Sequence, residues 1–337
     1  MKQLIIAEKP SVATDLAKAL GVNSKTNDHY EDDSTIISSA LGHLVELFMP
    51  DDFDKNLKTW RLRNLPIIPE SFRLKPITKT RKKFQDLKKL MGRKDVGEVV
   101  NACDAGREGE LIFTYLYEAA KCQKPIKRMW MSSMTLGSIR QAYEDLRQKE
   151  TMQPLQDAAR CRSEADWLIG INGTRAVTLK KSRGKARQMT TVGRVQTPTL
   201  SLVVGREREI INFKPLKYWR LSGSFKVANG EYEGQCQKDD FKKNEANPHD
   251  RVDRFWDQGQ VIELHQRLSS QAQATVTETK KRKPEQPGRL FDLTTLQRTA
   301  NSRLKYSASR TLQIAQSLYE RHKVITYPRT DSKALPE

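Results

Sequence analysis

The chain has 337 residues, and its 60 Lys and Arg outnumber its 41 Asp and Glu, which gives a net charge of +19. This length allows a substantial core divided among roughly two to four domains, and the charge favours nucleic acid over an acidic membrane surface as partner. No apolar run is long enough to span a bilayer, and the absence of a Cys-x-x-Cys pair argues against a zinc ribbon and fits a reducing cytoplasm.

The first predicted elements are a buried strand over residues 2–8 and a helix that begins at about Pro10 and ends at Gly21. Glu8 and Lys9 therefore lie in a strand-to-helix turn, which in an α/β sheet faces the ligand-binding edge. Glu8 joins the acids of another turn there if the two strands are neighbours. The alternative is an exposed Glu-Lys pair that contributes little.

A second apolar run ends near Cys103 and is followed by three acids, Asp104, Glu108 and Glu110. Gly106 and Gly109 allow the backbone to approach a phosphate or a metal ion closely. Carboxylates at the carboxyl end of a strand suit a hard cation such as Mg²⁺. The alternative is a solvated turn whose glutamates complement the dipole of the following helix.

The rest of the first 150 residues continues the alternation of strands and helices. An apolar segment covers residues 34–47, a basic and exposed helix or loop covers 73–89, and a further strand covers 127–132. Thr135 is placed to cap the next helix. The order predicts an α/β layer domain with a mostly parallel sheet.

A long helical pattern over residues 153–179 leads into a basic loop. The basic residues of this loop are Lys180, Lys181, Arg183, Lys185 and Arg187. They are expected to attract phosphates without selecting a base sequence. Arg194 and Gln196, beside Gly193, are candidates for lining a nucleic-acid groove, and a tight turn with a helix start is the alternative interpretation.

From Leu216 the apolar period changes to two, which predicts strands. Asn229-Gly230 predicts a type I′ hairpin turn, and the alternation over 272–276 predicts a returning strand. The sequence therefore predicts a small antiparallel β unit over about 215–278.

Helices are predicted over 293–303 and 307–321, followed by Tyr327 on an extended segment because Pro328 disfavours a helix there. The phenol has polar neighbours, namely Arg329, Asp331 and Ser332. A buried core aromatic is the ordinary interpretation, but this polar surrounding is unusual for one.

Four stretches together resemble the motifs of type IA DNA topoisomerases, nearest to the bacterial topoisomerase III branch. They are IIAEKPS at 5–11, DAGREGE at 104–110, GRVQTP at 193–198 and ITYPRTDS at 325–332. They occur in the order of the family, and the resemblance covers essentially the whole chain.

The resemblance implies a multidomain fold that combines α/β, α and β parts. Its expected domains are a Toprim α/β domain at 1–152, a helical single-stranded-DNA-binding segment at 153–213, a β arch segment at 214–279 and the start of the helical tyrosine domain at 280–337.

The resemblance also implies a transesterification in which Tyr327 attacks a phosphodiester of single-stranded DNA and forms a 5′-phosphotyrosine. Arg329 and Lys9 are expected to offset negative charge, and Glu8 to act as the general acid. The expected Mg²⁺ ligands are Glu8, Asp104 and Glu108. No ATP is required, and no glycine-rich turn resembles a Walker loop.

Two features depart from the family pattern. Gly106 replaces an acid that many members carry, so metal binding is expected to be weaker or different. The ring of the family is closed by segments well beyond the tyrosine, so this chain is expected to be a fragment, a truncated product or a half that pairs with another chain.

Three functions remain open at this point. The first is a type IA topoisomerase or its amino-terminal part, in the bacterial cytoplasm at the nucleoid. Its expected partners are single-stranded DNA, a RecQ-type helicase or a single-strand-binding protein, and the missing carboxyl-terminal half. The alternatives are a DNA-binding module without strand passage, and a metal-dependent Toprim nuclease or primase.

Overall fold

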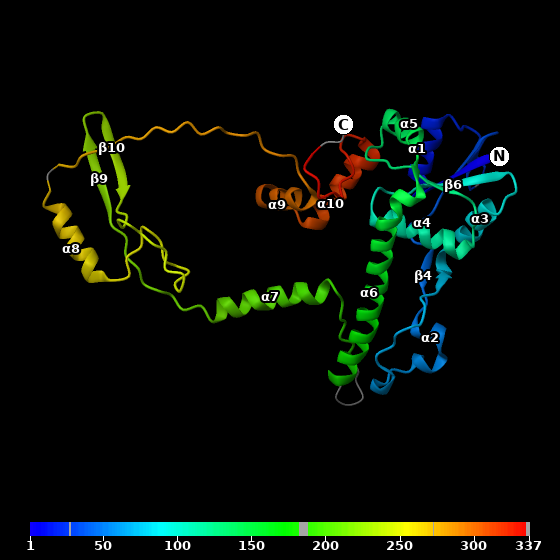
Figure 1. The fold of residues 1–337 in the computed structure, drawn as a ribbon, viewed down its shortest axis with the longest axis horizontal. Coiled ribbons are helices and arrows are strands. Elements are labelled where there is room, and N and C mark those ends of the chain that lie inside the picture. The colour runs from blue at the N-terminus through cyan, green and yellow to red at the C-terminus, as the bar shows by residue number, and fades with distance from the viewer. Residues whose placement is uncertain (27, 182–187, 272, 335–337) are drawn as a thin grey trace. The chain divides into compact units, whose positions relative to one another are not determined.

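The computed structural model describes residues 1–26, 28–181, 188–271 and 273–334 (Figure 1). The chain divides into two units, one formed by Met1–Thr199 with Pro287–Glu337 and the other by Leu200–Gln286. The basic residues Arg183, Lys185 and Arg187 lie outside the described residues.

The first unit is built on a six-stranded sheet. Its strands, in spatial order, are β2 (Tyr30–Glu31), β3 (Thr35–Ser39), β1 (Lys2–Ala7), β6 (Val96–Ala102), β7 (Ile126–Arg128) and β8 (Arg147–Gln148). The four inner strands are parallel, and the two edge strands are antiparallel to their neighbours. The predicted mostly parallel sheet is confirmed.

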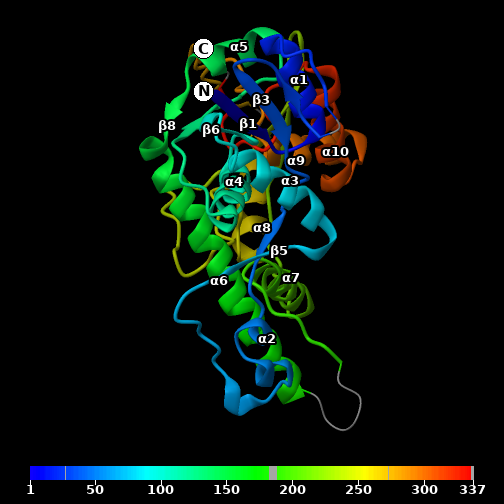
Figure 2. The same ribbon diagram turned by 90° about the vertical axis from the view of Figure 1, so that its right-hand side faces the viewer.

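Alternating side chains of the inner strands serve two separate cores. Leu4 and Ile6 pack with α3 (Arg81–Met91), α4 (Arg107–Ala120) and part of α6 (Lys149–Lys181). Ile5 and Ala7 pack on the other face with α1 (Pro10–Leu20) and α5 (Leu136–Glu144). Figure 2 shows α1 and α5 on one side of the strands and α3 and α4 on the other. The result is an α/β/α layer arrangement.

The helix boundaries follow local capping chemistry. Gly21 ends α1 in the left-handed conformation with φ 76°, which glycine adopts without steric cost. The Thr135 hydroxyl accepts a hydrogen bond of 3.3 Å from the Ser138 N–H at the start of α5, as the sequence predicts.

A long excursion between β3 and α3 packs alongside α6. It contains α2 (Pro50–Phe53), η1 (Lys55–Lys58), η2 (Leu62–Asn64), η3 (Thr78–Thr80) and the antiparallel strand pair of β4 (Val45–Leu47) with β5 (Leu74–Pro76). Trp167 of α6 donates from Nε1 to the Phe48 carbonyl at 2.9 Å. The side-chain amide of Asn172 accepts a hydrogen bond from the Ile67 N–H and donates one to the Ile67 carbonyl. These contacts hold the excursion alongside α6 (Figure 1).

The predicted helix over 153–179 is confirmed and extended in α6. The segment after residue 188 runs back along this helix, where Thr190 bonds the Thr178 hydroxyl and Val192 bonds the Thr174 hydroxyl. A Cβ at Gly173 would lie 2.8 Å from a methyl carbon of Val192. The close approach of this segment therefore requires a glycine on α6. The chain then enters α7 (Gln196–Ile211).

The second unit contains the predicted hairpin, formed by β9 (Ser222–Val227) and β10 (Gly230–Gln235). Val227 pairs with Gly230, so the turn is Ala228-Asn229, one residue earlier than predicted. The prediction of a type I′ turn is wrong, because such a turn needs positive φ at both central residues and neither has it. Gly230 takes the positive φ instead, at 152°.

The returning strand predicted over 272–276 is also wrong. Residue 272 lies outside the described residues, and 273–276 form no strand. Its alternating positions carry mostly alanine, which offers little apolar surface to pack against a neighbour. An unpredicted helix, α8 (Gln258–Ser269), precedes this stretch, and its N-terminal N–H groups bond to the Asp257 side chain.

The carboxyl-terminal part returns to the first unit. It contains α9 (Leu293–Leu304), α10 (Ala308–Ser317) and the short π-helical turn η4 (Leu318–His322), so both predicted helices are confirmed. The Tyr327 N–H then donates to the Ser132 carbonyl at 3.1 Å. This contact places Tyr327 beside the loop that follows β7, on the non-helical segment that Pro328 predicts.

Candidate active site

Glu8 and Asp104 leave the sheet at the same edge. Ala7 at the end of β1 is paired in register with Ala102 at the end of β6. Because the strands are parallel neighbours, the residues that follow them emerge side by side. The expectation that the two acidic turns are adjacent is confirmed.

The acidic turn after β6 is shaped by a close backbone approach. A Cβ at Gly109 would overlap with the Asp104 carbonyl oxygen, whereas a Cβ at Gly106 would meet nothing within 4 Å. Gly106 is also extended, with φ 178°. The fold therefore requires glycine at 109 but not at 106.

The buried side chain of Arg128 holds this turn in place through hydrogen bonds. Its guanidinium donates to the Cys103 carbonyl at 2.8 Å, to the Asp104 carbonyl at 2.9 Å and to the Glu110 carboxylate. Arg128 is 1% exposed and Glu110 is 0% exposed. Glu110 thus neutralises a buried cation and is not free to replace the acid missing at position 106.

The sequence interpretation missed the role of Arg128, which it placed only as part of a strand. A signal was present, because a charged residue within an otherwise apolar strand is rarely buried without a partner. The identity of that partner was not readable from the local sequence.

Glu8 occupies a buried and electrostatically unusual position. Burial and then the negative charge of Asp104 raise the pKa of Glu8 to about 7, against the lowering effect of Lys9 and Arg329. Its Oε2 atom is buried and has no hydrogen-bond partner among the described residues. A carboxyl group of this kind holds a proton near neutral pH, which suits a general acid.

Lys9 connects the acidic turn to the carboxyl-terminal segment. Its Nζ atom lies 2.7 Å from Glu320 Oε1 and 3.5 Å from Asp104 Oδ2. Glu320 belongs to η4 and was not among the predicted site residues. Lys9 therefore lies near Asp104, but its shortest ion pair is to an acid that the sequence interpretation did not name.

Tyr327 lies beside the same acids. Burial, then the charges of Asp104 and Glu8, raise the pKa of the Tyr327 phenol, and Arg329 lowers it. Arg329 thus acts in the expected direction but is outweighed, so the phenol is protonated at neutral pH in this arrangement. The Tyr327 ring also meets the Tyr319 ring edge-on, with centroids 5.4 Å apart.

The predicted metal ligands are only partly gathered. Glu8 offers an unpaired buried oxygen next to Asp104, which fits a cation, whereas Glu108 Oε2 lies 3.4 Å from His43 Nε2. Within the described ranges, no group of three His, Cys, Asp or Glu side chains is arranged to hold a metal ion. The three-acid ligand set remains a prediction.

A cavity of about 240 Å³ adjoins the acidic turn. It is lined by His43, Arg107, Glu108, Leu111, Ala159, Arg162, Ser163 and Asp166. Arg194 Nη1 lies 3.2 Å from Asp166 Oδ1, so this predicted DNA-binding residue borders the cavity. The cavity therefore joins the turn after β6 to the helix α6.

The other predicted DNA-binding residues lie elsewhere. Gln196 is exposed at the start of α7, and Lys180 and Lys181 are exposed at the end of α6. Lys180 is roughly 21 Å along the helix from Asp166, at 1.5 Å per residue. The structure does not bring these lysines to the acidic turn.

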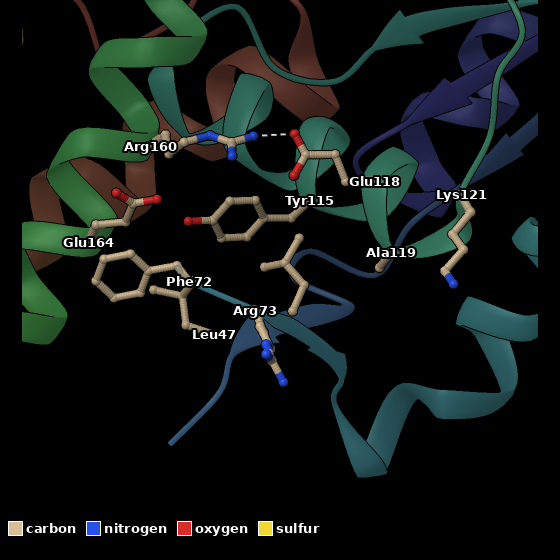
Figure 3. Close-up of a pocket in the computed structure, with 10 residues that line it drawn as sticks. Leu47, Phe72, Arg73, Tyr115, Glu118, Ala119, Lys121, Arg160 and Glu164 are labelled. Carbon is tan, nitrogen blue, oxygen red and sulfur yellow. Dashed lines mark hydrogen bonds and ion pairs between the residues drawn. The ribbon is translucent and has the colours of Figure 1, made fainter. Parts of the chain in front are cut away.

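A second cavity, of about 300 Å³, lies toward the other end of α4 (Figure 3). Tyr115 projects into it, and Arg160 pairs with Glu118 at its rim. None of the predicted catalytic residues lines it. This cavity is therefore separate from the acidic turn, where the predicted catalytic residues lie.

Comparison with known proteins decides the family. Residues 150–337 match the family model described as DNA topoisomerase, which is more than half of the chain. The chain belongs to the DNA topoisomerase family. Residues 3–134 match the Toprim domain. The predicted resemblance to type IA topoisomerases is confirmed, while the division into domains at 152, 213 and 279 remains a prediction.

Topoisomerase relatives match the chain along almost its full length. DNA topoisomerase 3 of Shouchella clausii is 42% identical over 334 residues, covering 99% of this chain and 44% of the relative. DNA topoisomerase 3 of Bacillus subtilis is 42% identical over 336 residues, with the same coverage. The chain thus spans less than half the length of these relatives.

A solved structure shows the same fold. Full-length topoisomerase I of Thermotoga maritima is similar with a TM-score of 0.66 and 24% identity, covering 99% of this chain and 50% of that chain. Among the described residues, no helix is both long and apolar enough to cross a membrane.

Proposed function

We propose that this chain carries the cleavage chemistry of a type IA topoisomerase, in which Tyr327 breaks and rejoins single-stranded DNA. The observation that carries the proposal is the position of the phenol, which lies in the electrostatic field of Glu8, Asp104 and Arg329. Two strand ends and a remote carboxyl-terminal segment supply these groups, and no packing role requires such a set of charges.

The reaction is a transesterification at phosphorus. The Tyr327 oxygen forms a bond to the phosphorus atom while the bond from phosphorus to the 3′ oxygen breaks, which leaves a 5′-phosphotyrosine and a 3′-hydroxyl. The phenol proton passes to Asp104, with which Tyr327 shares a hydrogen bond, and Glu8 protonates the departing 3′ oxygen. The reverse steps rejoin the strand, so no ATP is consumed.

The cations of the site offset the charge that develops on the phosphate. Arg329 is exposed and close enough to lower the pKa of Tyr327, and Lys9 lies beside Asp104. Cations positioned at a reacting phosphate offset the negative charge that develops in its transition state. Arg329 and Lys9 are the groups assigned to this role.

We assign the metal site to Glu8 and Asp104, with Glu108 reorienting from His43 to join them, and Mg²⁺ as the ion. A bound divalent cation supplies positive charge for phosphate oxygens. Gly106 leaves one acid fewer than many family members carry, so weak binding is expected.

We place the DNA strand in the cavity between the acidic turn and α6. Arg107, Arg162 and the neighbouring Arg194 give it positive charge, which attracts phosphates without base selection. Lys180 and Lys181 then serve a more distant part of the strand.

The proposal extends to the setting of the protein. The expected partners are single-stranded DNA, a RecQ-type helicase or single-strand-binding protein, and the further segments that the longer relatives contain. The expected place of action is the bacterial cytoplasm, at the nucleoid. A DNA-binding module without strand passage is the second candidate. It is favoured because the chain spans only 44% of the length of its topoisomerase 3 relative.

The test is covalent capture. The chain is incubated with single-stranded DNA labelled at the 5′ or the 3′ end, denatured, and compared with Tyr327→Phe. We expect protein-linked label only from the wild type and only from the fragment downstream of the break. Intact binding without an adduct would support the binding module, and metal-dependent cleavage that survives Tyr327→Phe would support the nuclease.

A further inference from the structure

Glu320 lies outside the four motifs, yet it is the acid closest to the Lys9 ammonium. Glu320 Oε1 lies 2.7 Å from Lys9 Nζ, whereas Asp104 Oδ2 lies 3.5 Å away. Both partners of this contact are partly shielded, with side-chain exposures of 33% for Lys9 and 29% for Glu320. The contact is therefore a hydrogen-bonded ion pair and not a loose surface pair.

The position of Glu320 is fixed by its neighbour. Tyr319 is 4% exposed and packs in the same core as Ile5 and Met129. Its ring also contacts the ring of Tyr327. The backbone of η4 is therefore anchored on the sheet, and Glu320 is held at a constant place relative to the nucleophile.

Lys9 needs such a partner because its own neighbours compete for it. A lysine ammonium is a point charge on a flexible four-carbon stem, and both Glu8 and Asp104 attract it. Without Glu320 the ammonium would settle on these two acids. It would then neutralise the groups that the reaction uses and be withdrawn from the phosphate.

We infer that Glu320 is a positioning residue for the cleavage step, which keeps the Lys9 ammonium from pairing closely with Asp104 so that it stays available to a DNA phosphate. This inference rests on the proposed function. It assigns Glu320 no contact with the reacting atoms, so its effect is expected on the rate of cleavage and not on the binding of DNA.

The structure offers a matched control for this role. Lys323 Nζ lies 2.5 Å from Asp15 Oδ1, so a second ion pair joins the end of the same segment to α1. Asp15→Asn weakens this attachment without touching Lys9. If Glu320 only attached η4 to the sheet, the two substitutions would have the same effect.

The experiment measures single-turnover cleavage of an end-labelled oligonucleotide over a range of DNA concentrations. Glu320→Gln is expected to lower the rate at saturating DNA about tenfold and to change the half-saturating concentration less than about twofold. Asp15→Asn is expected to stay within about twofold of the wild type in both quantities. In a Lys9→Gln background, Glu320→Gln is expected to add less than about a further twofold.

Three results would overturn the inference: an unchanged rate in Glu320→Gln, an equal loss in Asp15→Asn, or full additivity with Lys9→Gln. Thermal unfolding of each variant is recorded in parallel. If Glu320→Gln does not fold, Glu320→Asp decides, because it keeps the charge on a shorter stem and is expected to cleave at an intermediate rate. No adduct even in the wild type refutes the proposed function itself.

Discussion

The chemistry at the residue scale depends on placing charges where water cannot fully solvate them. Glu8 and Asp104 share one sheet edge, and the burial of Glu8 makes its charged form unfavourable. The same acids raise the pKa of Tyr327, which Arg329 only partly counteracts. Burial and neighbouring charges thus raise the pKa of both Glu8 and Tyr327, which favours their protonated forms before cleavage.

The titration of Glu8 gives a direct test at this scale. In the metal-free protein its pKa is expected at about 7, and Asp104→Asn is expected to lower it because a repelling charge is removed. Carbon NMR of the glutamate carboxyl groups measures both values, with Glu8→Gln to assign the signal. A Glu8 pKa at the ordinary 4.5 would contradict the described burial.

The acidic turn can be tested through its two glycines. Gly109→Ala is expected to destabilise the protein by about 1–3 kcal/mol, because the new methyl group overlaps with the Asp104 carbonyl. Gly106→Ala adds the same methyl group where nothing lies within 4 Å, and is expected to be tolerated. Denaturant unfolding compares the two variants, and equal losses would refute the role given to Gly109.

At the scale of elements, α4 uses its opposite sides for different tasks. Glu108 and Glu110 are two residues apart and therefore point about 200° apart around the helix. Glu108 is exposed next to His43, whereas Glu110 is fully buried against Arg128. One side of the helix faces the candidate site and the other supports the turn from within.

Glu110→Ala is expected to cost about 3–5 kcal/mol, because it leaves the Arg128 guanidinium buried without its counter-ion. Glu108→Ala is the control in the same helix and is expected to change stability by less than about 0.5 kcal/mol. The free energy of unfolding from urea titrations distinguishes them. A small loss in Glu110→Ala would mean that Arg128 does not depend on this pair.

The elements that the sequence predicted well are those with a strong local signal. Apolar periodicity and capping residues located β1, α1, α5 and α6, and the strand ends correctly brought Glu8 next to Asp104. Arg128 and Glu320 were missed because their partners are 18 and 311 residues away in the chain. The prediction of the turn type at Asn229 was wrong because a shift of one residue in strand register changes which residues form the turn.

At the scale of the whole molecule, the net charge of +19 matches a protein that binds a polyanion. The positive residues are not gathered in one place, since Arg194 borders the cavity at the acidic turn whereas Lys180 and Lys181 are exposed at the far end of α6. The chain also spans only 44% of the length of its topoisomerase 3 relatives. DNA binding is therefore expected from several regions of the chain.

The salt dependence of DNA affinity tests how much the end of α6 contributes to DNA binding. Replacing Lys180 and Lys181 together by Gln is expected to reduce the slope of log affinity against log salt by about 1.4, because two phosphate contacts to single-stranded DNA are lost. Replacing the exposed pair Lys88 and Lys89 on α3 removes the same charge and is expected to leave the slope nearly unchanged. Equal effects would show that only net charge matters.

The central claim is that Tyr327 is the nucleophile, and the most direct test identifies the atom that carries the DNA. The covalent complex is trapped by denaturation, digested with nuclease and trypsin, and analysed by tandem mass spectrometry. The account predicts a 5′-phosphonucleotide on Tyr327 of the wild-type chain. A nucleotide on the adjacent Tyr319, on any other residue, or on none would contradict it.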